Sequence, residues 1–121
     1  MKRLALVVVA AISLITPAGA VDFNSFVTNL DGSPTVGPDG KQMEVKLGVI
    51  IQNALLADYK DEQIAGEEKI KRFLLAKNIQ EHRDYSMTTE EIVLVKKLVA
   101  KSYPPLITGQ VWQAIDPGSV K

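Results

Sequence analysis

The feature that most restricts the fold is the segment "TTEEIVLVKKLVAKSYPP" (residues 88–105), because both of its ends carry helix signals. Thr88 followed by Glu91 matches a capping box, in which each side chain accepts a hydrogen bond from the other residue's backbone N–H. Pro104 disfavours helical geometry at the residue before it. Pro105 suits the first turn of a following helix, since no N–H donor is needed there. The segment therefore predicts two consecutive helices that meet at a proline corner.

Apolar residues spaced three and four apart predict helices across residues 47–116. The first begins at Leu47, and the second begins near Glu67, where Glu67–Lys71 and Glu68–Arg72 pairs add support. The last begins at Pro105 and ends at the turn-forming "DPG". The apolar positions are Leu47, Ile50, Ile51, Ala54 and Leu55 in the first helix, Ile70, Phe73, Leu74 and Ala76 in the second, Ile92, Val95, Leu98 and Val99 in the third, and Ile107, Val111 and Ile115 in the last.

Residues 21–46 predict extended chain interrupted by turns. "DGSP" and "GPDG" combine Gly, Asp and Pro, the residues that favour tight turns, and "KQMEVKL" after them suits a short return strand. The predicted fold class is therefore mainly α (α+β), with a short N-terminal β-hairpin followed by a compact bundle of about four helices. We expect one small globular domain over residues 21–121, made of an extended and turn element (21–46) and a helical body (47–116).

The first 20 residues have the three-part layout of a secretory signal peptide. Two basic residues precede an apolar run of about a dozen residues, which is short of the roughly 20 needed to span a bilayer. The small residues Ala18 and Ala20 then suit a signal peptidase, so we predict cleavage between Ala20 and Val21. An uncleaved membrane anchor, or a segment retained in the mature protein, remains an alternative.

Composition narrows the classes of partner. Acidic and basic residues are equal at 14 each, and loss of Lys2 and Arg3 with the leader would leave the remainder slightly acidic. Binding to nucleic acid needs clustered basic residues, so we expect no nucleic-acid partner. The chain has no cysteine, which excludes disulfides, thiol catalysis and cysteine-ligated zinc. We expect contact with a membrane only through the leader during export.

No pattern in the sequence predicts catalysis or a bound cofactor. His82 is the single histidine, and the serines occur in no nucleophile-elbow motif. Two of the adjacent carboxylate pairs lie where helices start, a position that stabilises negative charge for structural reasons. The glycines match no nucleotide-binding fingerprint. We therefore predict a protein that is not an enzyme and has neither a cofactor nor a metal site.

One stretch, "SYPPLITGQVW", is a candidate partner surface. It brings Tyr103, Pro104, Pro105 and the only tryptophan, Trp112, close together in the sequence, and exposed aromatic residues often dominate interface energetics. The alternative is that Tyr103 and Trp112 close the core between the last two helices.

The segments "NALLADYKDE", "GEEKIKRFLLAKNI" and "TTEEIVLVKKLVAKSYPPLITGQVWQAID" resemble a group of small proteins encoded by tailed bacteriophages and prophages. The resemblance covers about residues 21–116 and excludes the hydrophobic leader. It implies a short extended N-terminal part followed by the same succession of helical segments. It implies no activity for any named residue.

Two functions remain open at this point. The first is an exported, non-enzymatic interaction protein that binds a protein partner or itself, in the periplasm, at the cell envelope or outside the cell. The second is a phage-derived structural or assembly protein, in the virion or cytoplasm, that oligomerises and keeps its hydrophobic N-terminal arm. The leader distinguishes them, since the first starts at Val21 and the second at Met1 or Lys2.

Overall fold

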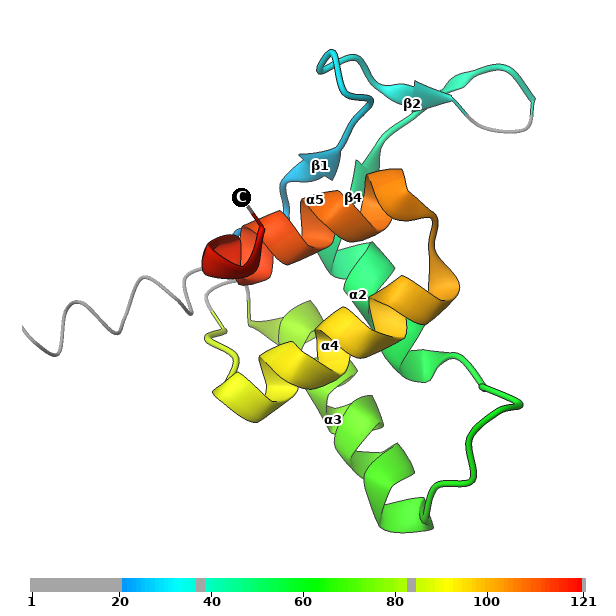
Figure 1. Ribbon diagram of the computed structural model, residues 1–121, viewed down its shortest axis with the longest axis vertical. Coiled ribbons are helices and arrows are strands. Elements are labelled where there is room, and N and C mark those ends of the chain that lie inside the picture. Colours follow the sequence, from blue (N-terminus) through cyan, green and yellow to red (C-terminus); the bar gives the residue numbers. More distant parts are fainter. Residues whose placement is uncertain (1–20, 37–38, 83–84, 121) are drawn as a thin grey trace, which may run out of the picture.

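Four helices follow a short β element within the residues that this computed structural model describes, which are 21–36, 39–82 and 85–120 (Figure 1). The mainly α, α+β class predicted from the sequence is confirmed. The helices are α2 (Leu47–Leu56), α3 (Gly66–Glu81), α4 (Thr89–Ser102) and α5 (Pro105–Ile115), and a 3-10 turn, η2 (Pro117–Ser119), comes after α5.

The β element, called the β arm here, consists of two short antiparallel pairs of strands. β1 (Phe26–Val27) pairs with β4 (Val45–Lys46), and β2 (Thr35–Val36) pairs with β3 (Gln42–Met43). Both turn segments predicted from the sequence contain a glycine with positive φ, Gly32 at 87° and Gly40 at 79°. Glycine adopts this conformation without the steric cost that a Cβ would add. Figure 1 shows the arm projecting from one end of the helical body, with α3 at the opposite end.

A side-chain amide attaches the β arm to α5. The Gln110 Nε2 donates to the backbone oxygen of Thr28 at 2.6 Å, and the Thr28 N–H donates to the Gln110 Oε1 at 3.0 Å. Both backbone groups of Thr28 are therefore hydrogen-bonded at the point where β1 ends.

The core lies on the inward face of α2, against α3, α4 and the chain that enters α2. Every apolar position predicted for the first helix is buried there. Ile92 and Ile107 are only half-buried, at the margin of the core. The buried apolar residues outside α2 are Val21, Phe23, Val27, Leu75, Ala76, Ile79, Met87, Val95, Leu98, Val99, Val111 and Ile115.

The N-terminal segment of the body passes very close to the start of α2. The Gly48 N–H donates to the backbone oxygen of Phe23 at 2.9 Å. A Cβ built on Gly48 would lie 3.0 Å from that oxygen and 3.1 Å from the Cβ of Phe23. The absence of a side chain at Gly48 thus permits this contact.

The predicted helix boundaries around the proline corner are confirmed. Thr88 caps α4: its Oγ1 accepts from the Glu91 N–H at 3.2 Å, and a Glu91 carboxylate oxygen accepts from the Thr88 N–H at 2.8 Å. α4 ends at Ser102, and Pro105 occupies the first turn of α5. These boundaries arise from local signals, as the sequence predicts.

Helix α3 has apolar residues on two opposite sides. Leu75, Ala76 and Ile79 are buried together with Arg72, following the spacing i, i+3, i+4, i+7 from Arg72. The other predicted apolar positions face solvent, with exposed fractions of 59% for Ile70, 54% for Phe73 and 49% for Leu74. The core thus contacts the side of α3 that contains an arginine, and the prediction that Ile70, Phe73 and Leu74 form the apolar core face of this helix is wrong.

Candidate functional site

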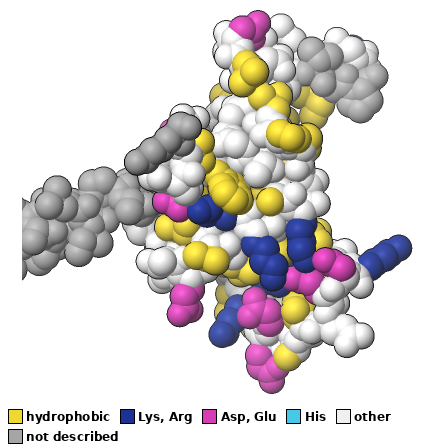
Figure 2. All heavy atoms as spheres, in the orientation of Figure 1, with side chains coloured by type: hydrophobic (Ala, Val, Ile, Leu, Met, Phe, Trp, Pro, Cys, Tyr) yellow, Lys and Arg dark blue, Asp and Glu magenta, His cyan; other side chains and the backbone are white. Residues whose placement is uncertain are grey.

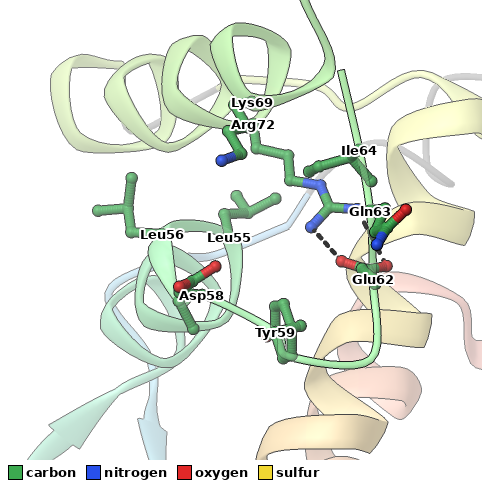
Figure 3. Close-up of a pocket in the computed structure, with 10 residues that line it drawn as sticks. Leu55, Leu56, Asp58, Tyr59, Glu62, Gln63, Ile64, Lys69 and Arg72 are labelled. Atoms are coloured by element: carbon green, nitrogen blue, oxygen red, sulfur yellow. Dashed lines mark hydrogen bonds and ion pairs between the residues drawn. The ribbon is translucent and has the colours of Figure 1, made fainter. Parts of the chain in front are cut away.

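The largest cavity among the described residues opens between the end of α2, the connection that follows it, and α3 (Figure 3). Its volume is about 540 Å³. Leu55 and Leu56 border it from α2, and Figure 3 shows Arg72 extending from α3 toward Glu62 on the connection. The lining therefore combines leucine side chains with a buried ion pair.

Arg72 and Glu62 form the central contact of this cavity. The Arg72 Nη1 donates to Oε1 of Glu62 at 2.9 Å, and its Nη2 donates to Oε2 at 3.3 Å. The Arg72 Nε also donates to Glu68, four residues earlier on α3, at 3.4 Å. Arg72 is only 4% exposed, and the Glu62 side chain is 10% exposed. This is a bidentate arginine–carboxylate pair that is largely buried.

The hydrogen bonds from Arg72 hold the pKa of Glu62 at about 2, well below its ordinary 4.5, although burial acts in the opposite direction. The positive charges of Arg72 and Lys101 lower this pKa further. The same contact with Glu62 raises the pKa of Arg72. A general base works best when its pKa lies near the operating pH. Glu62 is therefore poorly suited to accept a proton near neutral pH, and its geometry fits a structural role.

Two further contacts attach the connection to α4. Lys101 forms an ion pair with Asp61 at 2.9 Å and lies 3.5 Å from Glu62. The Tyr59 hydroxyl donates to the backbone oxygen of Ala54 at 2.6 Å and is hydrogen-bonded to the Ser102 hydroxyl at 2.6 Å. Figure 2 shows acidic and basic side chains next to one another over this end of the molecule. The charges around the cavity thus mostly neutralise one another.

The candidate partner surface proposed from the sequence is divided between different environments. Tyr103 is half-buried against the core, whereas Pro104 and Pro105 are exposed. Trp112 is half-buried beside α4, where its Nε1 donates to the backbone oxygen of Lys96 at 3.0 Å. The Lys96 ammonium lies 4.5 Å from the centre of the Trp112 ring. Both aromatic side chains thus have contacts within the protein.

The predicted cleavage site lies at the edge of the described residues. Ala18 and Ala20 fall outside them, while Val21 belongs to the buried core. His82, the single histidine, is exposed at the end of α3.

A second surface was not singled out from the sequence as a site. We call it the outer face, and it comprises Val49 and Leu56 of α2 and Ile70, Phe73 and Leu74 of α3, each at least 43% exposed. A groove of about 300 Å³ between α2 and α3 runs along it, bordered by Leu56, Phe73 and Ala76. The apolar spacing in α3 was visible in the sequence, but it does not tell which side of the helix meets the core.

Among the described residues, no three histidine or acidic side chains lie close enough to hold a metal ion. No helix in the described part of the chain is sufficiently long and apolar to cross a membrane. No protein-family model, curated protein or solved structure matches this chain. The resemblance to small phage proteins therefore remains a hypothesis from the sequence.

Proposed function

We propose that this chain is exported through its leader and acts as a non-enzymatic binding protein, in the periplasm or at the cell envelope, whose protein partner covers the outer face. The observation that carries the proposal is the exposure of Ile70, Phe73 and Leu74 on one side of α3. Contiguous exposed apolar side chains are typical of interaction sites in soluble proteins.

The chemistry of the largest cavity supports binding over catalysis. Its buried charged groups, Arg72 and Glu62, are hydrogen-bonded to each other. A pKa of about 2 keeps Glu62 ionised at neutral pH. These groups hold the connection in place. The outer face beside them would gain from being covered, because burying apolar area is favourable.

The binding role is tested by affinity capture from the native source with three forms of the protein. We expect the wild type to retain a specific set of partners and the double variant Phe73→Ser/Leu74→Ser to lose it. Val93→Ser is the matched control, because Val93 is 61% exposed on α4, away from the outer face. Identical capture by all three forms would contradict the proposal.

Export is tested separately, by intact-mass measurement of the protein from its native source. We expect the chain to start at Val21. A start at Met1 or Lys2 would contradict cleavage and favour the alternative of an assembly protein that keeps its N-terminal arm.

A further inference from the structure

One line of exposed residues runs along α3 on the side opposite the core. Five exposed residues, spaced three, four, three and four positions apart, form this line: Glu67, Ile70, Leu74, Lys77 and Glu81. This is the spacing of the contact line between two helices of a coiled coil, and it repeats every seven residues. We call these residues the seam. Its centre is apolar and its flanks are charged.

The seam is complementary in charge and in apolar contacts to a second copy of itself that runs in the opposite direction. Ile70 and Leu74 are each two residues from the level of Arg72, and Glu67 and Lys77 are each five residues from it. A two-fold axis at that level places Ile70 against Leu74 of a second copy and Glu67 against Lys77 of that copy. Each contact then occurs twice, as a symmetric dimer requires. With a rise of about 1.5 Å per residue, the apolar contacts lie about 3 Å from the axis and the ion pairs about 7.5 Å from it.

From this complementarity we infer that the outer face of α3 binds the same face of a second copy, with the two α3 helices antiparallel. The inference rests on the proposed function, because it names the partner of the surface assigned there. A parallel pair in register would place Glu67 against Glu67 and Lys77 against Lys77, and like charges in contact are unfavourable. The charges thus favour the antiparallel direction, and an axis at the level of Arg72 is the position at which both Glu67–Lys77 pairs form.

The residues beside the seam fit this arrangement. Phe73 is next to the axis on the side toward α2, so the Phe73 rings of the two copies meet and cover the groove at Leu56. On the other side of the axis, the Lys71 side chains of the two copies approach each other. In each copy Lys71 shares a hollow with Glu68 and Glu90, and these acidic residues offset the repulsion between the two lysines. Figure 1 shows α3 at the end of the body away from the β arm, so the arm does not obstruct a second copy there.

A single pair of helices of this length buries less than the roughly 800 Å² per partner of a standard interface. We therefore expect dissociation in the micromolar range. Sedimentation velocity of the purified protein in its mature form, over a concentration series that spans this range, measures the monomer–dimer equilibrium directly.

Charge reversal tests the register. Glu67→Lys and Lys77→Glu each turn two ion pairs into like-charge contacts, and we expect either change to raise the dissociation constant about tenfold. The double variant Glu67→Lys/Lys77→Glu restores both pairs, so its dissociation constant returns to about that of the wild type. Glu81→Lys is the matched control, since it changes the same charge on the same seam without an opposing charge in the dimer.

A wild-type protein that stays monomeric throughout the series overturns the inference, and so do single charge reversals without effect. Binding of that monomer to phosphatidylglycerol vesicles, lost in Phe73→Ser/Leu74→Ser, would assign the seam to a lipid surface and also overturn it. If the protein is monomeric but still captures another protein through Phe73 and Leu74, the inference that the partner is a second copy is overturned. The proposed function is not contradicted by that result.

Discussion

The buried pair between Arg72 and Glu62 supports a quantitative prediction. Glu62→Gln keeps the shape of the side chain and one oxygen acceptor but removes the negative charge. Arg72 then stays buried with only the longer contact to Glu68, at 3.4 Å, to balance its charge. We expect this variant to fold with a clearly lower free energy of unfolding.

Two estimates of the loss agree. The pKa of Glu62 falls from 4.5 to about 2 on folding, and each pKa unit corresponds to about 1.4 kcal/mol, which gives about 3 kcal/mol at neutral pH. Removing one partner of a buried ion pair typically costs about 3–5 kcal/mol. For a domain of about 100 residues, a loss of 3 kcal/mol lowers the melting temperature by about 12–24 °C.

The dependence on pH distinguishes the ion pair from a simple packing defect. Because the pKa of Glu62 is lower in the folded protein than in the unfolded chain, its stabilisation is complete above about pH 5 and is lost as the pH falls toward 2. The difference between the wild type and Glu62→Gln should thus shrink from about 3 kcal/mol at pH 7 to roughly half of that at pH 3. Urea denaturation of both proteins at the two pH values measures this difference.

Two control variants complete the experiment. Asp61→Asn breaks the neighbouring ion pair to Lys101, where Asp61 is 68% exposed, and should cost less than about 1 kcal/mol. Glu62→Leu/Arg72→Met removes both buried charges and should be much more stable than the single variant. A difference between Glu62→Gln and the wild type below about 1 kcal/mol at pH 7, or one that is the same at pH 3, would refute the reasoning.

Two other substitutions follow from the packing. Gly48→Ala should lower the free energy of unfolding by about 1–3 kcal/mol, because the new Cβ would meet Phe23, whereas Gly109→Ala in α5 has open space and should raise it by up to about 1 kcal/mol. Thermal melts that rank the two variants in the opposite order would contradict this. Trp112→Phe should cost about 1 kcal/mol in urea denaturation, since it removes the hydrogen bond to the Lys96 backbone oxygen. No change in the midpoint would show that this hydrogen bond contributes nothing.

The boundaries of α4 and α5 could be predicted because their causes are local. The capping box of Thr88 and Glu91 and the two prolines act within one helical turn of their own positions. The turns of the β arm also have local causes, since Gly32 and Gly40 themselves adopt the positive φ that the turns need. Signals of this kind need no knowledge of the tertiary structure.

The orientation of α3 could not be predicted in the same way. Its two apolar sides both follow helical spacing, and the buried one includes Arg72, which a hydropathy pattern counts as polar. Burial of this arginine depends on Glu62, ten residues earlier on a non-helical connection, and on lysines of α4 that approach the same carboxylate. The cavity and the outer face thus result from contacts between separate elements, which spacing within one helix does not encode.

The amide of Gln110 has a consequence beyond anchoring the β arm. By donating to and accepting from Thr28, it occupies the backbone positions that a neighbouring strand would otherwise use. Unpaired strand edges invite intermolecular β-sheet growth, and natural proteins protect them. One glutamine on α5 thus closes this part of the strand edge to pairing with another chain, with no extra strand needed for the purpose.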